Sequence, residues 1–343
     1  MTQIVRKEAG PSLSTSEMSR ATRDALISIR KMIPPLLPKF YKGQMGSVAV
    51  IGGSQDYTGA PYFSAMACAK TGADLVHVIC EPQAAQVIKT YSPNLMVHPL
   101  MRQSDRASTG DSALSIATKI IELLPRLHVL VIGPGLGRDK LMLDTCVYVI
   151  EAAKKLNMPL VIDADGLSLA QTNSGLFQNY TDCIMTPNLR EFSRLCESKN
   201  ISPSSSDGVE SVERLSLAFG GVTIIQKGMK DFISNGKRTM ISDIEGGLKR
   251  SGGQGDSLTG SLATFLCWRK AYLDKIWDHS GDLNSSDLLA LAAYGGSALT
   301  RECSRLAYLK KGRSMQASDM LEEVHGAFQA LFESSLTDPK PWS

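Results

Sequence analysis

The stretch Ser47-Val48-Ala49-Val50-Ile51-Gly52-Gly53 decides how the rest of the chain is interpreted. A short apolar run that two glycines close is typical of a buried strand in a parallel sheet. An Ala-rich helical stretch follows at residues 61–72, with Pro at its start and Gly at its end. Apolar runs and helical stretches then alternate as far as residue 226. This alternation predicts a parallel sheet with helices on both faces.

The other predicted elements continue the pattern and then change it near the C-terminus. Further strands are predicted at residues 75–80, 129–132, 160–163, 183–186 and 222–226, and helices at 84–90, 112–124, 141–156, 188–197 and 211–219. Two more β-prone runs, 231–234 and 238–241, are joined at Asn235-Gly236, a pair that is typical of a hairpin. Three helices, at 256–272, 286–301 and 317–331, complete the chain. We therefore expect an α/β fold whose mostly parallel sheet has an antiparallel edge.

The domain organisation follows from where this pattern begins and ends. No repeat and no linker interrupts residues 45–335, so we expect an N-terminal extension at 1–40, a single domain at 41–335 and a C-terminal tail at 336–343. A helix is expected at residues 17–31, ending before Pro34-Pro35. The extension is basic but also carries acidic residues, so we expect a cytoplasmic protein and keep a mitochondrial address open.

Composition excludes several classes of protein. The 343 residues are 43% hydrophobic and carry 37 Lys and Arg against 34 Asp and Glu, which gives a net charge of +3. This balance gives no reason to expect nucleic acid or a membrane surface as a partner, and no apolar run is long enough to cross a membrane. Seven Cys without a C-x-x-C motif are expected to be small buried residues in a reducing compartment.

Glycine clusters at the predicted strand ends locate the candidate site, because ligands bind beyond the carboxyl ends of parallel strands. The most informative cluster is Gly252-Gly253-Gln254-Gly255-Asp256, which directly precedes a long helix. Glycines and a helix N-terminus can hold a phosphoryl group, and a carboxylate there can accept a proton from a substrate hydroxyl. The alternative interpretation is a Gly-rich turn in which Asp256 is an ordinary N-cap. The sequence contains neither the G-x-G-x-x-G nor the Walker-type spacing, which disfavours a Rossmann dehydrogenase and a P-loop NTPase.

Two other segments favour nucleotide chemistry. Asn188 and Glu191 lie one helical turn apart at a helix start, where their oxygens could hold hydrated Mg²⁺ or could simply cap the helix. Lys227 and Gly228 end a strand, where they could approach a nucleotide or face solvent. Asp163 and Asp165 could form a carboxylate pair, but N-capping of the next helix is the interpretation we favour.

Together these segments resemble the ATP-dependent NAD(P)H-hydrate dehydratases, which have a ribokinase-like fold. The resemblance covers residues 42–330 and excludes the N-terminal extension. It rests on the motifs Lys42-Gly43-Gln44, Val48–Gly53, Tyr57–Phe63, Gly72–Leu75, Tyr91-Ser92-Pro93, Gly133–Gly137, Asp163–Leu167, Thr186–Asn188 with Glu191–Arg194, Lys227-Gly228 and Gly252–Asp256.

The resemblance implies a three-layer α/β/α sandwich and a repair reaction. The S epimer of hydrated NADH or NADPH (NADHX or NADPHX) would lose water at the expense of ATP, in the presence of Mg²⁺. Phosphorylation of the C6 hydroxyl would convert a poor leaving group into phosphate, which the ring nitrogen helps to expel. The resemblance also implies a functional partnership with an NAD(P)HX epimerase and leaves a homo-oligomer open.

The same resemblance assigns roles to individual residues. Asp256 would be the catalytic base, with Gly253, Gln254 and Gly255 forming the anion hole for the phosphoryl group, and Glu191 and Asn188 would be the Mg²⁺ candidates. ATP would contact the segments 227–231 and 246–255, that is Lys227, Gly228, Met229, Lys230, Asp231, Gly246, Gly247, Leu248, Lys249, Arg250, Ser251, Gly252, Gly253, Gln254 and Gly255. The hydrate would contact Tyr57, Gly59, Gly137, Asn188, Leu189, Arg190, Glu191, Phe192, Ser193, Arg194 and Asp256.

Three rival functions remain at this point. A kinase of the same fold would make a stable phosphorylated alcohol, and a nucleotide-binding regulator would have lost turnover. The retained Asp256 disfavours the regulator. A nicotinamide-dependent dehydrogenase is disfavoured by the absent dinucleotide motif.

Overall fold

The computed structural model describes residues 18–173, 175–202 and 208–333, and within them nine strands form one sheet. The order along the sheet is β3-β2-β1-β4-β5-β6-β7-β8-β9, with β1 to β7 parallel and the last two strands antiparallel. The strands are β1 (Ser47–Ile51), β2 (Leu75–Ile79), β3 (Met96–His98), β4 (Val129–Ile132), β5 (Leu160–Ile162), β6 (Cys183–Met185), β7 (Thr223–Gln226), β8 (Asp231–Ser234) and β9 (Thr239–Ser242). The predicted parallel sheet with an antiparallel edge is thus confirmed.

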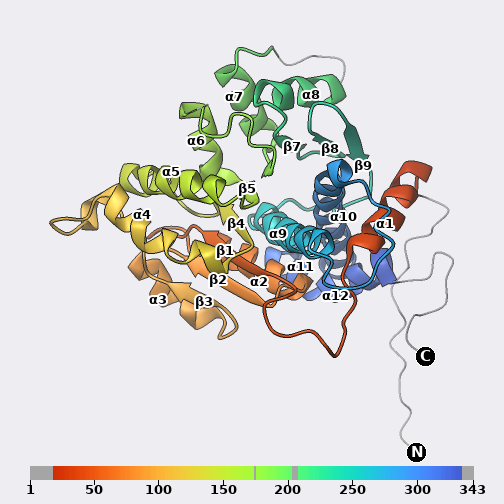
Figure 1. Ribbon diagram of the computed structural model, residues 1–343, viewed down its shortest axis with the longest axis horizontal. Coiled ribbons are helices and arrows are strands. Elements are labelled where there is room, and N and C mark those ends of the chain that lie inside the picture. Colours follow the sequence, from red (N-terminus) through yellow and green to blue (C-terminus); the bar gives the residue numbers. More distant parts are fainter. Residues whose placement is uncertain (1–17, 174, 203–207, 334–343) are drawn as a thin grey trace, which may run out of the picture.

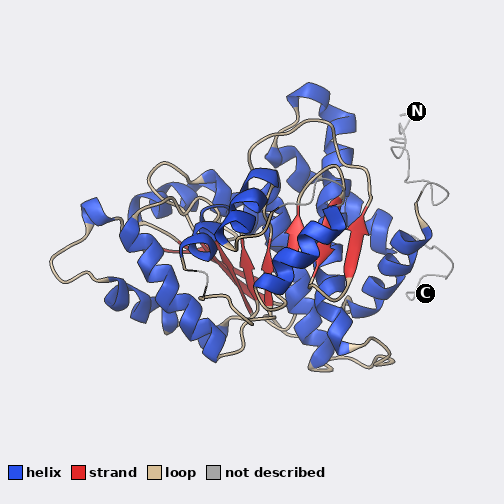
Figure 2. Cartoon of the chain, turned by 90° about the horizontal axis from the view of Figure 1, so that it is seen from above, coloured by secondary structure: helices blue, strands red, loops and turns tan. Residues whose placement is uncertain are grey.

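Helices cover both faces of the sheet, which makes the molecule a three-layer sandwich (Figures 1 and 2). The helices are α1 (Arg20–Met32), α2 (Gly59–Thr71), α3 (Pro82–Tyr91), α4 (Ala113–Ile121), α5 (Lys140–Lys155), α6 (Leu167–Thr172), α7 (Leu189–Ser198), α8 (Gly208–Ala218), α9 (Gln254–Leu273), α10 (Ser285–Lys311), α11 (Ala317–Glu322) and α12 (Val324–Phe328), followed by a π-helical turn at Gln329–Glu333. One core lies between the sheet and the helices α1, α2, α9 and α10, and the other lies under α4 to α8.

Alternating strand residues supply the two cores. Val48 and Val50 of β1 face the first core, whereas Ala49 and Ile51 face the second. All five residues of β1 are buried because the strand lies in the interior of the sheet with helices on both sides. The uninterrupted apolar run that predicted this strand therefore has a direct structural cause.

The structure departs from the predicted elements in four places. β3 and α6 were not predicted, because runs of three and six residues are too short to show a clear period. The helix expected at 317–331 is divided near Glu323, a buried carboxylate that pairs with Lys310 of α10 at 2.7 Å. α10 itself continues to Lys311, well beyond the expected end.

Helix α1 packs onto the domain. It begins after Ser19, whose side chain caps the helix, and it buries Leu26 and Ile29 against the first core. Thr22 Oγ1 donates a hydrogen bond to Asp243 Oδ1 at 2.5 Å. The same hydroxyl shares a hydrogen bond with the hydroxyl of Tyr294, a residue of α10, at 2.9 Å. The part of the N-terminal extension that the structure describes from residue 18 onward is thus tied to the body of the protein. Among the described residues, no helix is long and apolar enough to cross a membrane.

Candidate active site

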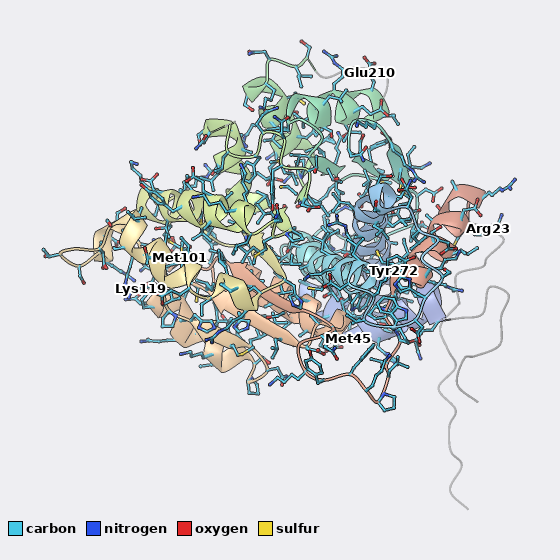
Figure 3. The ribbon with its side chains drawn as sticks, viewed as in Figure 1. Arg23, Met45, Met101, Lys119, Glu210 and Tyr272 are labelled. Carbon is cyan, nitrogen blue, oxygen red and sulfur yellow. The ribbon has the colours of Figure 1, made fainter. Side chains whose placement is uncertain are left out.

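A cavity of about 680 Å³ opens at the carboxyl ends of β5, β6 and β7, where the sequence predicted a ligand site. The turn after β5, the start of α7, the loop after β7 and the glycine loop before α9 all contribute to its wall. Its lining residues are Asp163, Ala164, Asn188, Leu189, Glu191, Lys227, Gly228, Met229, Asp231, Gly246, Arg250–Asp256, Leu258, Thr300, Arg301, Ser304 and Met320. Figure 3 labels Met45, which lies before β1, and Tyr272, which lies near the end of α9. Residues next to each of them line a different pocket, at the amino-terminal edge of the sheet.

The glycine loop delivers the N-terminus of α9 into this cavity. Gly253 is the N-cap and has a φ of 92°, a left-handed conformation that favours glycine. A Cβ at this position would also lie 2.5 Å from Cβ of Ala317. Because the first backbone N–H groups of a helix have no partner within it, residues 253–255 can donate to an anion here.

Asp256 lies in the first turn of α9 rather than at its cap. The N-cap is Gly253, so the alternative interpretation of Asp256 as an ordinary N-cap is wrong. The loop before it is held by the side-chain amide of Gln254, which donates to the carbonyl of Lys249 at 2.9 Å. Asp256 therefore presents its carboxyl group to the cavity from a fixed helix start.

An ion pair between a half-buried lysine and a buried aspartate lies beside this helix start. Lys227 Nζ donates to Asp163 Oδ1 at 2.8 Å, and the two side chains are 22% and 3% exposed. A Cβ built on Gly255 would lie 3.3 Å from Lys227 Nζ and 3.4 Å from Asp163 Oδ2. The pair is thus in contact with the residue that precedes Asp256. Asp163 occupies the N-cap position of the short 3-10 helix Ala164–Gly166, as expected from the sequence, but its side chain makes no capping hydrogen bond and pairs with Lys227 instead.

This environment changes the proton affinity of Asp256. Burial raises the pKa of Asp256 to about 7, and the nearby carboxylates of Asp163 and Asp165 act in the same direction, while Lys227 opposes them. Burial works to lower the pKa of Lys227, but the adjacent Asp163, with Glu191 and Asp256, raises it above its ordinary value. A carboxylate with a pKa near neutrality is suited to accept a proton during turnover.

The loop after β7 is organised by Arg301 of α10. Arg301 pairs with Asp231 at 3.0 Å and also donates to the carbonyls of Gly228 and Met229. The other oxygen of Asp231 accepts from Ser297 at 2.8 Å. These contacts hold the backbone of the predicted ATP segment against α10.

Asn188 and Glu191 form a reciprocal capping box at the start of α7. Asn188 Oδ1 accepts from the backbone N–H groups of Arg190 and Glu191 at 3.0 Å, and Glu191 Oε2 accepts from Asn188 N at 2.8 Å. Both side chains also line the cavity, so capping and metal binding are compatible roles. Within the described ranges no group of three or more His, Cys, Asp or Glu side chains could hold a metal ion. A magnesium ion here would therefore take much of its coordination from phosphate and water.

Tyr57 and Gly137 belong to a neighbouring group at the ends of β1 and β4. Gly137 N donates to Asp165 Oδ2 at 2.9 Å, and the Tyr57 side chain is 55% exposed. A Cβ on Gly135 would lie 2.9 Å from the carbonyl oxygen of Tyr57, so the two loops are in contact. Asp165 connects this group to the turn that carries Asp163.

The structure does not bring every predicted residue to the cavity wall. Phe192 is 3% exposed and packs in the second core, so its side chain supports α7 rather than facing a ligand. Gly247 packs against α10, where its N–H donates to Ser304 Oγ at 3.2 Å. The other predicted residues that do not line the cavity are Tyr57, Gly59, Gly137, Arg190, Ser193, Arg194, Lys230, Leu248 and Lys249.

Several cavity residues were not predicted. Arg301, Thr300 and Ser304 come from α10, which carries no recognisable motif, so only the packing of α10 reveals them. Asp163 did have a signal, because it directly follows a predicted strand. Its ion pair with Lys227 depends on a contact across 64 residues of sequence, which no local pattern shows.

The fold is that of ribokinase-like proteins, and the glycine loop brings the N-terminus of α9 to the cavity, where a helix can bind an anion. A ribokinase-like superfamily protein from Enterococcus faecalis superposes with a TM-score of 0.68 at 22% identity, covering 89% of this chain and 94% of that one. An ADP/ATP-dependent NAD(P)H-hydrate dehydratase from Bacillus subtilis, co-crystallised with ATP and Mg²⁺, gives a TM-score of 0.59 at 18% identity, covering 88% of this chain and 97% of that one.

Sequence comparison identifies the family. The model of the NAD(P)H-hydrate dehydratase family matches residues 48–325. The ATP-dependent (S)-NAD(P)H-hydrate dehydratase of Phaeosphaeria nodorum is 60% identical over 324 residues, which cover 94% of this chain and all of that protein. The chain therefore belongs to the NAD(P)H-hydrate dehydratase family, as its sequence motifs predicted.

Proposed function

We propose that this chain repairs damaged nicotinamide cofactors by removing water from the S epimer of NADHX or NADPHX at the expense of ATP. The observation that carries the proposal is the position of Asp256. Its pKa is raised to about 7, and it lies in the first turn of α9 beside N–H groups that can receive a phosphoryl group. The relatives that are named ATP-dependent (S)-NAD(P)H-hydrate dehydratases support the choice of substrate.

The chemistry follows from this arrangement. Asp256 accepts the proton of the C6 hydroxyl while that oxygen attacks the terminal phosphorus of ATP, and ADP leaves. The backbone N–H groups of Gly253, Gln254 and Gly255 stabilise the charge on the transferring phosphoryl group. The C6–O bond then breaks with help from the ring nitrogen lone pair, phosphate departs and C5 loses a proton. The products are NAD(P)H, ADP and phosphate.

Two sets of residues hold the reactants. The segments 227–231 and 246–255 bind ATP, and Arg301 positions the first of them through Asp231. The start of α7 and the group formed by Tyr57, Gly59 and Gly137 bind the hydrate. Glu191 and Asn188 lie where they can contact hydrated Mg²⁺, which neutralises phosphate charge when bound.

A direct assay tests the proposal. The purified protein is incubated with (S)-NADHX, ATP and Mg²⁺, and the near-ultraviolet absorbance of NADH is followed together with ADP and phosphate. We expect absorbance to recover with matching release of both products. Persistence of a phosphorylated alcohol, without NADH and without phosphate, would instead establish a kinase of this fold.

Substitution of the proposed base tests the mechanism. Asp256→Asn keeps the shape of the side chain but cannot accept the proton. We expect turnover to fall by about two orders of magnitude or more, while ATP binding measured by calorimetry stays nearly intact. Unchanged turnover would remove Asp256 from the mechanism.

We also propose a cytoplasmic location and a functional partnership with an NAD(P)HX epimerase, which supplies the S epimer. All seven cysteines are free and buried, which suits a reducing compartment. Fluorescent fusions with and without residues 1–17, which precede α1, test the location and keep the packed helix in place. A mitochondrial signal that is lost on truncation would overturn it.

A further inference from the structure

The ion pair between Asp163 and Lys227 lies beside the start of the catalytic helix, and the mechanism described so far gives Asp163 no role. We infer that Asp163 is a positioning residue that pairs with the Lys227 ammonium group, offsets its charge toward Asp256 and thereby makes Asp256 a stronger base. The inference rests on the proposed function, since it concerns the same base.

Backbone contacts fix both members of the pair at strand ends. Asp163 N donates to Ile132 O at 3.1 Å, and Asp163 O accepts from Gly166 N at 2.9 Å. Lys227 N donates to Pro187 O at 3.0 Å. Asp163 follows β5 and Lys227 follows β7, so the 2.8 Å contact spans the end of β6 between them. The ammonium group can therefore occupy only a small region beside α9.

The contact with Gly255 brings this pair to the reaction site. A Cβ on Gly255 would lie 3.3 Å from Lys227 Nζ and 3.4 Å from Asp163 Oδ2, so even the smallest side chain at this position would touch both charged groups. The next residue is Asp256, and all three side chains line the same cavity. A change in the position of Lys227 therefore changes the electrostatic environment of the Asp256 carboxyl group.

Stability alone gives little reason to keep such a pair. A buried ion pair loses most of its Coulombic gain to the desolvation of two charges, so replacement by apolar residues is often neutral. Asp163 is 3% exposed, and its side chain caps no helix although it stands at an N-cap position. A functional role explains why a charged side chain occupies this position.

The charges around Asp256 define what the pair does. Asp163 and Asp165 face it from the turn after β5, and Lys227 faces it from the end of β7. Glu191 of α7 interacts with the same lysine, and Arg250 of the glycine loop also lines the cavity. Asp163 adds a negative charge near Asp256 and engages much of the positive charge of Lys227. Removal of the Asp163 charge would therefore favour the ionised form of Asp256 and make it a weaker base.

The variant Asp163→Asn tests this directly. We expect the acid limb of the kcat-against-pH profile to move to lower pH by about one unit, because the pKa of Asp256 falls. The plateau kcat should fall about tenfold, while KM for the hydrate stays within about twofold. An unmoved acid limb in a folded, active variant would overturn the inference.

A matched ion pair supplies the control. Asp182, directly before β6, pairs with Arg269 of α9 at 2.9 Å, and neither residue lines the cavity. Asp182→Asn removes one carboxylate charge and one ion pair with the same substitution. We expect its pH profile and kcat to match those of the unmodified protein. A similar shift in both variants would show a general charge effect and would also overturn the inference.

Variants of the lysine keep the test open if Asp163→Asn fails to fold. Lys227→Gln removes the positive charge, so the acid limb should move to higher pH, whereas Lys227→Arg should leave it near its original position. Combining Asp163→Asn with Lys227→Gln should leave the acid limb and kcat close to the Lys227→Gln values, because Asp163 acts mainly by offsetting the charge of the lysine. Two results would contradict the action of Asp163 through Lys227. One is that the effects of the two substitutions on kcat multiply in the double variant, and the other is that the acid limb of Lys227→Gln does not move.

The two levels of failure can be told apart. If the unmodified protein restores no NADH from (S)-NADHX and ATP, the proposed function fails before any variant is compared. If the unmodified protein is active and Asp163→Asn has the same pH profile, only the positioning role fails.

Discussion

Asp256 carries a proton affinity that neither its residue type nor its sequence neighbours explain. Burial and the nearby Asp163 raise its pKa to about 7, well above the ordinary value of an aspartate. The folded protein therefore keeps this proton between about pH 4 and pH 7, where the unfolded chain releases it. This group makes the folded state less stable as the pH rises through that window.

The same difference predicts a pH-dependent gain in stability. Asp256→Asn removes the titrating group, so the stability of the variant relative to the unmodified protein should increase from pH 4 to pH 8. Thermal melting midpoints of both proteins at pH 5 and pH 8 measure this change. A difference in midpoint that is the same at both pH values would contradict the raised pKa.

A substitution of Glu191 distinguishes helix capping from metal binding by this side chain. Glu191→Gln keeps an oxygen that can accept from Asn188 N, so the capping box and the melting midpoint should be preserved. Loss of the negative charge should raise the Mg²⁺ concentration needed for half-maximal turnover by about tenfold. A titration of the rate with magnesium measures this. An unchanged half-maximal Mg²⁺ concentration would leave Glu191 with the capping role alone.

At the scale of elements, the crossing of α2 and α9 determines where the catalytic helix lies. Gly260 of α9 faces the backbone of α2, and a Cβ there would lie 2.0 Å from Ser64 O and 2.7 Å from Cys68 N. Ser64 and Thr259 also share a hydrogen bond at 2.8 Å across the same crossing. The close approach of the two helices therefore depends on a glycine within α9.

A methyl group at this crossing should separate the helices. Gly260→Ala gains helix propensity, yet we expect it to lower the free energy of unfolding by about 2 kcal/mol, because backbone atoms must move. Urea unfolding measures the change. Gly326→Ala in α12 is the control, since its Cβ would meet only Leu306 at 3.9 Å, and it should be neutral or slightly stabilising. Equal effects at both sites would contradict the packing argument.

At the scale of the whole molecule, α1 closes the first core although it precedes the recognised motifs. Ile29 is fully buried against that core, whereas Ile27 on the same helix is 44% exposed. α1 packs on α10, and α10 provides Arg301 for the loop after β7. The described part of the N-terminal segment is thus connected to the site through one long helix.

This arrangement predicts a marked contrast between two identical substitutions. Ile29→Ala should lower the free energy of unfolding by about 3 kcal/mol, because it leaves a cavity in the core. Ile27→Ala should change it by less than about 1 kcal/mol. Chemical unfolding of both variants tests this, and similar losses would mean that α1 is not packed as described.

The positions of most strands along the chain and the location of the site could be predicted from the sequence because both depend on local signals. Val48–Ile51 is apolar throughout, since a central parallel strand is covered on both faces. Gly253 stands where the backbone needs a left-handed φ of 92°, and Asn188 with Glu191 forms a capping box from residues three apart. Each of these patterns is complete within a few neighbouring residues.

Only the tertiary structure decided which side chains meet and what their charges do. Asp163 was predicted to cap a helix, yet it pairs with Lys227, and Arg301 was not predicted at all. Both contacts join residues more than sixty positions apart, so they depend on strand order and helix packing rather than on spacing. The sequence by itself determined the fold class, the family and the glycine loop with its aspartate. The proton affinity of that aspartate was decided by burial and by charges from other strands, because electrostatic interactions depend on distance in space.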